Sequence, residues 1–410
     1  MKKVVVTGIG AITPLGPDFS SLMNAVYQGQ SGVKALDTPW ISQLHSPLAA
    51  PVLFPVEDHF TKLRRLMLDR VAQLGLLAVK EAVNQAQLDT SVDAGLGGGI
   101  FWGTGMGGAH TLEQAYMDSF SNPTSRPRPT TIVMFMTNST TGQIGIEHKI
   151  KGPSTTYSSA CSSSAVAIGE AFEAIRHGKI NYAVAGGSEA LLTLGVMKAW
   201  ESLQTLARPD KEHPETSCRP FSKDRSGFIL GEGAASLILE SEEHAIQRGA
   251  NILCEIVGYG NTTDASHITQ PDANGQARAM SLALFQAGLS INDVDYINAH
   301  GTGTQVGDIS ETKAIHHVFG DRAKHIPVSA TKALHGHLMG ATGAVEMAIA
   351  LGSLLNRQIP GTAHLFNPDS ECDLDYVSEG ARVLEKIDVV MSNSFGFGGN
   401  NAVLVAKRYR

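Results

Sequence analysis

Cysteine is scarce in this chain and never occurs in closely spaced pairs. The 410 residues contain four cysteines, Cys161, Cys218, Cys254 and Cys372, and none belongs to a CxxC motif. So few cysteines in so long a chain exclude a disulfide framework, and no cysteine–histidine cluster indicates a zinc site. We therefore expect free thiols and a reducing, cytoplasmic environment.

Long hydrophobic runs, an excess of basic residues and nucleotide-binding motifs are also absent. No apolar stretch reaches the roughly 18 residues of a membrane helix, so no membrane insertion is expected. The N-terminal stretch MKKVVVTGIGAITPLG is interrupted by glycines and a proline, which favours a first strand over a signal peptide. The net charge of −7 argues against nucleic-acid binding. After Gly8 and Gly10, a dinucleotide-binding motif needs glycine where the chain has Thr13, and no P-loop or G-x-S-x-G motif occurs.

Short β-branched runs alternate with helical patterns along the chain. Strands are expected at 3–9, 97–105, 181–187, 234–240, 252–260, 294–301, 387–394 and 401–407, and helices at 68–86, 162–178, 275–289 and 341–355. This alternation predicts an α/β protein, and the nearly all-apolar strands indicate sheets that helices cover on both faces.

Two segments are consistent with an internal duplication. IFWGTGMGG (100–108) and NAHGTGTQVGD (298–308) both run from an expected strand into Gly-Thr-Gly. Such matches also arise by chance, because glycine, threonine and alanine are common, so duplication and coincidence remain about equally open. A duplication would divide the chain into halves of residues 1–250 and 251–410.

Cys161 differs from the other cysteines by its position in TTYSSACSSSAVAIGEAFEAI (155–175). Serines flank it and a helical pattern follows, so its sulfur is expected at a helix N-terminus. A free cysteine is more often a packing residue, and that interpretation applies to the other three. A thiol of pKa ~8.5 is only about 3% thiolate at pH 7, and lowering the pKa by two units takes about 2.7 kcal/mol. A helix terminus supplies roughly 0.3–2 kcal/mol, so a nucleophilic Cys161 needs a second polar group, for which histidine is the best candidate.

Two histidines are candidate partners of Cys161. His300 ends an expected strand in YINAHGTGT, and His337 lies in SATKALHGHLMGATG, five residues after Lys332. A histidine before a glycine turn suits a side chain that enters a cleft, although either histidine alone fits a loop residue without a role. His335 is interpreted as such a loop residue.

A glycine-rich segment near the C-terminus carries two phenylalanines. In SNSFGFGGNN (392–401), Phe395 and Phe397 alternate with glycines. The pattern fits a packing turn, or an aromatic gate whose backbone N–H groups form an oxyanion hole.

Together these stretches resemble the β-ketoacyl-[acyl-carrier-protein] synthases of the thiolase superfamily, specifically the synthase II type. The resemblance spans nearly the whole chain through seven ordered motifs: VVVTGIGAITPLG, ACSSS, RPFSKDRSGFILGEGA, DASHITQPD, NAHGTGTQVGD, TKALHGHLMGATGAVE and NSFGFGGNN. It implies a thiolase-like fold, in which two similar halves form a five-layer α/β/α/β/α sandwich. It also implies a homodimer, or a heterodimer with a related ketosynthase-like chain.

The resemblance implies a decarboxylative Claisen condensation in fatty-acid or polyketide chain elongation. Cys161 would accept an acyl chain, and malonyl-carrier protein would then lose CO2 and attack the acyl-cysteine. His300 and His337 would stabilise the thioester enolate and assist decarboxylation. Both substrates would arrive on the phosphopantetheine arm of an acyl carrier protein, so no further cofactor is expected.

Further roles follow from the resemblance alone. Backbone N–H groups of Cys161 and Phe397 would form the oxyanion hole, Phe395 would belong to the gate, and Lys332 paired with Glu346 would organise the site electrostatically. The substrate-binding positions are Thr302, Thr304, Met106, Ala199 and Trp200. No metal is required, although five positions match a structural cation site of relatives: Asn298, Glu311, Glu346, Ser392 and Asn393.

Sister enzymes supply the competing hypotheses. Thiolases carry a second active-site cysteine near the C-terminal glycine loop, which has none here. Initiating synthases have asparagine where this chain has His337, so the residues favour an elongating enzyme. A non-catalytic partner subunit would lack the cysteine, which this chain keeps.

The chain departs from the family pattern around the expected acyl pocket. In LGVMKAWESLQTLARPD (194–210), Trp200 replaces a phenylalanine and Gln204 an arginine, and the glycine loop ends GGNN (398–401) where GGTN is usual. Residues 138–144, NSTTGQI, are more polar than usual. These changes do not affect the residues expected to carry the chemistry. They do affect the expected acyl pocket, so housekeeping lipid synthesis and a specialised, fatty-acid-like or polyketide pathway remain equally open.

Carrier proteins of this family are acidic, so docking on an acidic enzyme needs a local basic surface. The candidate residues are Lys62, Arg64, Arg65, Arg70, Arg126 and Arg128. An ordinary solvated face explains them equally well.

Overall fold

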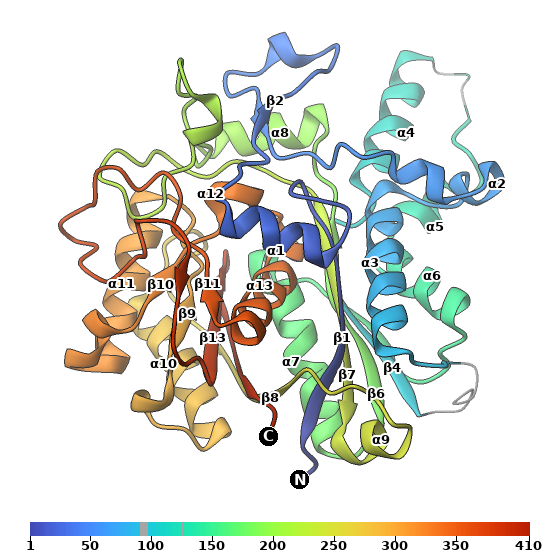
Figure 1. Ribbon diagram of the computed structural model, residues 1–410. Coiled ribbons are helices and arrows are strands. Elements are labelled where there is room, and N and C mark those ends of the chain that lie inside the picture. The colour runs from blue at the N-terminus through green and yellow to red at the C-terminus, as the bar shows by residue number, and fades with distance from the viewer. Residues whose placement is uncertain (91–96, 123, 125) are drawn as a thin grey trace.

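The computed structural model describes residues 1–90, 97–122, 124 and 126–410 (Figure 1). Its strands are β1 (Val4–Ile12), β2 (Lys34–Ala35), β3 (Leu48–Ala49), β4 (Gly98–Gly103), β5 (Ser154–Tyr157), β6 (Tyr182–Glu189), β7 (Gly233–Ser241), β8 (Cys254–Thr263), β9 (Tyr296–Asn298), β10 (Val328–Ser329), β11 (Gln358–Ile359), β12 (Arg382–Val383), β13 (Val389–Gly396) and β14 (Asn400–Arg408).

The helices alternate with these strands. They are α1 (Phe19–Tyr27), α2 (Lys62–Arg65), α3 (Arg70–Ala86), α4 (Ala109–Ser121), α5 (Thr131–Phe135), α6 (Ser139–His148), α7 (Ser163–Arg176), α8 (Leu194–Ser202), α9 (Glu242–Gln247), α10 (Ala273–Ala287), α11 (Gln305–Phe319), α12 (Lys332–His335) and α13 (Thr342–Asn356). Among the described residues, no helix is long and apolar enough to cross a membrane.

The main sheet repeats one strand arrangement twice. Its order is β10-β9-β13-β14-β8-β1-β7-β6-β4-β5. We number the five strands of each half by their order along the chain. Counted outward from β1 or from β8, their order in the sheet is first, fifth, fourth, second and third. In both halves the first two pairings are antiparallel and the next two are parallel. The two halves of this thiolase-like fold therefore have the same topology.

The two halves are joined by a short antiparallel pairing of β1 and β8. Only Val4–Val6 pair with Cys254–Ile256, and beyond them the strands diverge. The freed amide of Ile9 donates to Gln85 Oε1 of α3 at 2.6 Å, and that of Tyr259 donates to Gln286 Oε1 of α10 at 2.7 Å. In both halves a glutamine side chain thus accepts the strand amide that lacks a strand partner. A buried amide without a hydrogen bond would be costly.

Glycines on β1 and β8 let these outer helices lie close to the sheet. A Cβ at Gly10 would lie 2.0 Å from the carbonyl oxygen of Ala78 in α3, and one at Gly260 would lie 1.9 Å from that of Ala279 in α10. Because real Cβ contacts are never this short, only glycine fits either strand at these positions.

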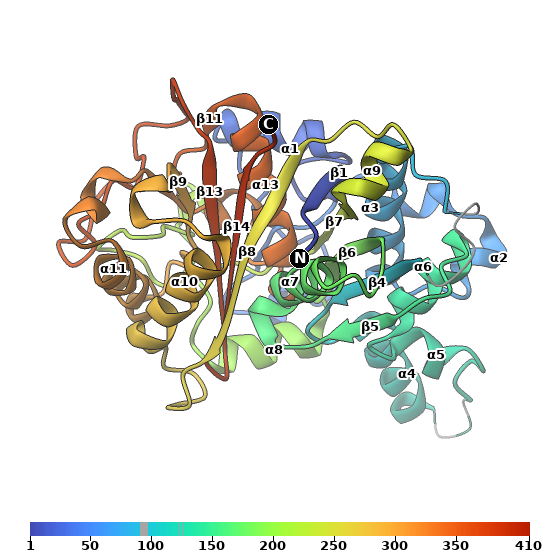
Figure 2. The same ribbon diagram turned by 90° about the horizontal axis from the view of Figure 1, so that it is seen from below.

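Helices α7 and α13 fill the space between the diverging halves (Figure 2). Helix α3 covers the outer face of the first half, and α10, backed by α11, covers the outer face of the second. Small residues keep the central pair close: a Cβ at Gly343 of α13 would lie 2.8 Å from the Cβ of Ala165 in α7. The arrangement confirms the predicted layered α/β fold, and both central helices begin at the site described below.

We predict that alanine at Gly10 or Gly260 lowers the free energy of unfolding by more than about 2 kcal/mol, because the added methyl group overlaps helix backbone. Gly142, an exposed helical glycine of α6 with open space around its Cβ position, is the matched control. Gly142→Ala should be neutral or up to about 1 kcal/mol more stable. Urea unfolding of the three variants measures this, and equal stability of all three would contradict the packing argument.

Candidate active site

Cys161 lies in a 3₁₀ turn, Ala160–Ser162 (η3), immediately before α7. Ala160 has φ of 52°, a left-handed conformation that is uncommon for a residue with a side chain. The neighbouring serines bind the backbone of this turn: Ser163 Oγ donates to the Ala160 carbonyl at 2.6 Å and accepts from the Ser159 amide at 3.0 Å. The serines seen in the sequence therefore hold the turn that presents the sulfur.

The Cys161 thiol is buried, with 6% of the residue exposed. Burial raises its pKa to about 11, although the Lys332 ammonium and backbone N–H groups of Phe397 and Cys161 at the sulfur oppose this. The expectation of a thiol poised for ionisation at the helix start is thus not met in the resting site. Loss of hydration outweighs the helix terminus, and Cys161 is a neutral thiol at pH 7.

His300 follows β9 and is fixed from both sides. The carboxylate of Glu311 accepts the amides of His300 and Gly301 at 2.9 and 2.8 Å. Lys332 Nζ lies 3.2 Å from His300 Nδ1. Because an ammonium can only donate, Nδ1 accepts, and the single proton of the neutral ring is on Nε2. Burial and the Lys332 charge hold the pKa of His300 well below its usual value, so the ring is neutral.

His337 follows α12 and has the same tautomer for a different reason. The backbone amide of Met339 donates to its Nδ1 at 3.1 Å, and Thr342 Oγ1 lies 2.9 Å from the same nitrogen. The proton of this ring is therefore also on Nε2. The edge of the Phe228 ring packs against the imidazole at 5.0 Å between centroids. Burial and Lys332 lower the pKa of His337 well below its usual value.

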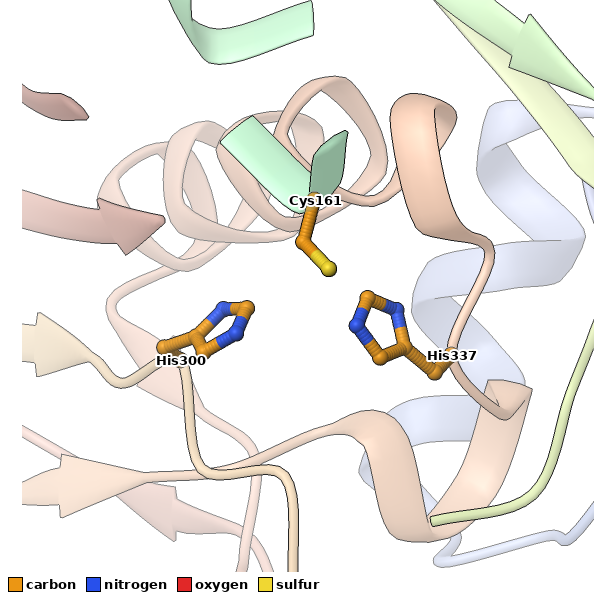
Figure 3. A group of neighbouring side chains, drawn as sticks. All are labelled: Cys161, His300 and His337. Carbon is orange, nitrogen blue, oxygen red and sulfur yellow. The ribbon is translucent and has the colours of Figure 1, made fainter. Parts of the chain in front are cut away.

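The sulfur and the two imidazoles converge on one small space (Figure 3). The potential ligand atoms of Cys161, His300 and His337 all lie within 4.8 Å of one another. A metal-bound histidine normally donates its second N–H to a neighbour, whereas both Nδ1 atoms here accept hydrogen bonds. The arrangement suits two N–H donors that bind an oxygen carrying negative charge beside a thiol.

Lys332 and Glu346 form a fully buried ion pair beside these residues. Lys332 Nζ donates to Glu346 Oε1 at 2.6 Å, and neither side chain is exposed. The ammonium also donates to the carbonyl oxygen of His300. All three of its protons are therefore engaged, which fixes the strand end that carries His300.

A cavity of about 350 Å³ extends from the sulfur to the surface. Of the predicted substrate-binding residues, Trp200, Thr302 and Thr304 line it. Met106 is 50% exposed on the loop after β4, and Ala199 is exposed on α8; neither lines this cavity. Its lining also includes the polar residues Gln270, Gln276, Gln305, Ser226 and Asn401.

The glycine loop between β13 and β14 closes one wall of the cavity. Phe395 packs its ring edge on His300 at 5.9 Å between centroids, and Phe397 directs its N–H to the Cys161 sulfur. A Cβ at Gly396 would lie 2.7 Å from the carbonyl oxygen of Ser159, so this loop lies directly against the nucleophile turn. The predicted gate and oxyanion-hole residues therefore meet at Cys161.

The residues matched to a structural cation site lie together behind His300. Three buried side-chain oxygens have no hydrogen-bond partner: Asn298 Oδ1, Glu346 Oε2 and Asn393 Oδ1. Ser392 pairs with Asn298 across β13 and β9, whereas both oxygens of Glu311 already accept hydrogen bonds. Oxygen donors that include one carboxylate fit a hard cation such as Na⁺, K⁺ or Mg²⁺.

The basic residues predicted for docking fall into two groups. Lys62, Arg64 and Arg65 form α2, with weak ion pairs from Arg64 to Glu147 at 3.5 Å and from Arg65 to Asp58 at 3.6 Å. Arg126 and Arg128 are exposed after α4.

Arg70, at the start of α3, differs from the rest of this basic set. Its guanidinium donates to both carboxylate oxygens of Glu232 at 2.6 and 2.7 Å. Its charge is therefore offset locally rather than presented to solvent.

Sequence reasoning missed Glu189, at the end of β6. Its buried carboxylate accepts the amides of Gly105 and Gly340 at 2.5 and 2.9 Å and the hydroxyl of Thr104 at 3.1 Å. It thus ties the loop after β4 to the turn after His337. Burial raises its pKa to about 7 despite these bonds. An acidic residue at the end of an otherwise apolar strand was the signal that could have found it.

We predict that alkylation of Cys161 by iodoacetamide accelerates about tenfold per pH unit from pH 7 to pH 10, because only the thiolate reacts and the pKa is about 11. Mass spectrometry of the modified peptide measures the rate, and Cys161→Ala reports any background from the other buried cysteines. A plateau below pH 9 would contradict the raised pKa.

Comparisons with known families agree with the geometry. Residues 1–245 match the family described as "Beta-ketoacyl synthase, N-terminal domain", and residues 253–366 match "Beta-ketoacyl synthase, C-terminal domain".

Two curated relatives match over nearly their whole length. The chain is 41% identical over 414 residues to "3-oxoacyl-[acyl-carrier-protein] synthase 2" of Staphylococcus aureus (strain COL), covering 100% of this chain and 99% of that protein. It is 39% identical over 407 residues to "Nodulation protein E" of Rhizobium meliloti (strain 1021), covering 99% of each.

Solved structures share the fold over the full length of both chains. A β-ketoacyl synthase from Burkholderia phymatum superimposes with a TM-score of 0.91 at 34% identity. The "ishigamide ketosynthase/chain length factor" does so with a TM-score of 0.92 at 31% identity. A type II polyketide ketosynthase solved with its acyl-carrier protein also gives 0.92, at 29% identity. The fold, the converging cysteine and histidines and these matches together place the chain in the β-ketoacyl synthase family.

Proposed function

We propose that this enzyme elongates acyl chains by decarboxylative Claisen condensation. An acyl group held on Cys161 reacts with malonyl-[acyl-carrier protein] and gives 3-oxoacyl-[acyl-carrier protein] plus CO2. The observation that carries this proposal is the convergence of a buried thiol and two neutral imidazoles whose Nε2–H groups are free to donate. The relatives include a protein named 3-oxoacyl-[acyl-carrier-protein] synthase 2 and a type II polyketide ketosynthase, so we propose either a fatty-acid or a polyketide chain as substrate.

The first half-reaction transfers the acyl group to Cys161. The sulfur attacks the thioester carbonyl carbon. The carbonyl oxygen accepts hydrogen bonds from the backbone N–H groups of Cys161 and Phe397. The carrier thiolate leaves, and it takes up the proton that Cys161 gives up. Because the proton passes from one thiol to the other, the step needs no permanently ionised cysteine.

The second half-reaction forms the carbon–carbon bond. The malonyl thioester oxygen binds between Nε2–H of His300 and Nε2–H of His337, which stabilise the enolate formed when CO2 departs. The enolate carbon attacks the acyl-cysteine carbonyl, and the Cys161 thiolate leaves and is reprotonated from solvent. Two neutral donors suit this step, since they attract the developing charge without quenching it by full proton transfer.

The substrates reach the site on the phosphopantetheine arm of an acyl carrier protein, and the enzyme needs no separate cofactor. Thr302 and Thr304, on the wall of the cavity, would contact the arm. An acidic carrier protein would dock on the exposed basic residues Lys62, Arg64, Arg65, Arg126 and Arg128. Arg70 is left out because Glu232 neutralises it.

We also propose a dimer with a second chain of the same fold. Beside the open edge of β5, exposed apolar side chains gather on α4, α5 and α6, including Tyr116, Phe120, Ile132 and Ile146 at 56–83% exposure. Such a surface indicates a protein interface. A related structure is a ketosynthase paired with a chain length factor, so the partner is an identical or a related chain.

Two remaining proposals concern the halves and the compartment. The halves would meet at residues 250 and 251, between α9 and β8, where the repeated strand order starts again. The four free cysteines fit work in the reducing cytoplasm.

The unpartnered oxygens behind His300 would hold a structural cation. Asn298, Glu346 and Asn393 would supply ligand oxygens, with Ser392 beside them. The cation would offset the carboxylate of Glu346 and stiffen the strand ends that carry His300. It takes no part in a proton transfer.

We predict that Cys161→Ala abolishes acyl transfer, whereas His300→Ala and His337→Ala still become acylated but lose condensation by about 10²–10³-fold, because each removes one oxyanion donor. Intact-protein mass spectrometry follows acylation, and 3-oxoacyl product follows condensation. Asparagine at His337 is the matched variant, since its amide restores an N–H donor in part.

The outcomes of this experiment separate the competing functions. Acylation without any condensation by the unmodified enzyme would indicate a non-decarboxylating acyltransferase, and no acylation would indicate a partner subunit. Full condensation by His337→Ala would refute the role given to that histidine.

We predict that protein dialysed into choline chloride melts about 2 °C or more below protein supplied with the cation it binds, because a ligand of the native state alone raises stability. Na⁺, K⁺ and Mg²⁺ are tested separately by differential scanning fluorimetry, with elemental analysis of the dialysed protein. Asn298→Ala should melt at one temperature in all buffers. No cation dependence and no bound metal would reject the site.

A further inference from the structure

Two side chains far apart in sequence act on the same residue. They are Trp200 of α8 and Asn400, the first asparagine of the GGNN segment. They lie 200 residues apart in sequence, yet both contact Phe397, one through the ring and one through the backbone. We propose that Trp200 and Asn400 form a latch that holds the Phe397 loop closed over Cys161.

The ring contact joins Phe397 to α8. The indole of Trp200 stacks on the Phe397 ring with centroids 6.0 Å apart and planes 25° from parallel. The indole also makes a T-shaped contact with the Phe228 ring, with centroids 5.7 Å apart, and Phe228 in turn packs on His337. Through Trp200 and Phe228, the Phe397 ring is therefore connected to His337.

The backbone contact fixes the peptide that follows the gate ring. Asn400 Nδ2 donates to the carbonyl oxygen of Phe397 at 3.1 Å, across the two glycines Gly398 and Gly399. Both glycines have positive φ, 81° and 72°, so this turn is intrinsically adaptable. The asparagine side chain bridges the two ends of the turn. It therefore restricts the backbone conformations that the two glycines alone would allow.

The residues on either side of Phe397 are held by backbone contacts, so Phe397 is the part of the loop that can move. Gly396 lies against the Ser159 carbonyl, and the carbonyl oxygen of Gly399 accepts the Asp264 amide at 2.9 Å. The amide of Gly398 donates to Ile268, whose side chain is 69% exposed on a surface segment. Both ends are anchored to the fold, and the residue between them depends on Trp200 and Asn400.

The latch has a chemical consequence at the sulfur. The Phe397 N–H is directed to Cys161 Sγ, and Phe397 and Trp200 line the cavity that leads to this sulfur. Opening admits the acyl thioester and also admits water or any small electrophile. If Cys161 carries an acyl group as proposed above, a tighter latch slows hydrolysis of the thioester to carboxylic acid and free thiol. The contacts of Trp200 and Asn400 with Phe397 thus set how well the acyl-enzyme is protected between half-reactions.

Access to the sulfur can be tested without assuming any reaction. Iodoacetamide labels Cys161 at fixed pH in the intact protein, and the rate is compared among Trp200→Ala, Asn400→Ala, Trp200→Phe and Leu203→Ala. Leu203 is the matched control, because it lies close to Trp200 at the end of α8, is 50% exposed and makes no ring contact with Phe397. Thermal melting of each variant shows whether it is folded.

We expect labelling three- to tenfold faster in Trp200→Ala and in Asn400→Ala, since a ring pair or a hydrogen bond of this kind is worth a factor of that size. Trp200→Phe and Leu203→Ala should stay within twofold of the unmodified protein. In a Phe397→Ala background, Trp200→Ala should add nothing further. Equal rates for Trp200→Ala and the unmodified protein, or a further gain in the Phe397→Ala background, would overturn the latch.

A second measurement separates this inference from the proposed function. Acyl-enzyme prepared from acyl-carrier protein is held without malonyl substrate, and release of free acid is followed. Faster release in the two latch variants supports the protective role, and unchanged release despite faster alkylation refutes it. If no acyl-enzyme forms in the unmodified protein, the proposed function fails, while the alkylation result still decides whether the latch exists.

Discussion

The buried ammonium of Lys332 is the interaction on which the site depends. It carries charge where water cannot reach, so its three protons must all find acceptors, and they find Glu346 Oε1, His300 Nδ1 and the His300 carbonyl. This one set of contacts assigns the tautomer of His300 and anchors the strand end that carries it. Burial, reinforced by the ammonium charge, lowers the pKa of both reacting imidazoles and keeps them neutral. A neutral residue at this position would leave the imidazole proton free to occupy either nitrogen.

The duplicated fold explains why these groups can meet. The strands β1 and β8 pair for three residues and then separate, because Gln85 and Gln286 take the amides that further pairing would have used. The separation makes room for α7 and α13, and the starts of these two helices bring Cys161 and the turn after His337 to one point.

Residue patterns predicted eight of the ten strands of the main sheet and the residues that converge, because strand periodicity and the small-residue helix starts are local properties. They missed the two edge strands β5 and β10, which have four and two residues and are therefore too short to show a periodic pattern. They could not predict the tautomers or the raised pKa of Cys161, since these depend on Lys332, Met339 and Phe397, which are distant in sequence. The ionic partner of Arg70 was hidden for the same reason: Glu232 is 162 residues away.

A neutral resting thiol is consistent with the chemistry rather than opposed to it. An exposed thiolate reacts with oxidants and electrophiles at all times. A buried neutral thiol becomes a strong nucleophile only when another group accepts its proton. The departing carrier thiolate is such a partner, and it is present only when the acyl donor is bound. The Phe397 N–H, which points to the resting sulfur, would then donate to the carbonyl oxygen of the bound thioester. Burial therefore makes Cys161 slow to react with other electrophiles and favours its reaction when the acyl thioester occupies the site.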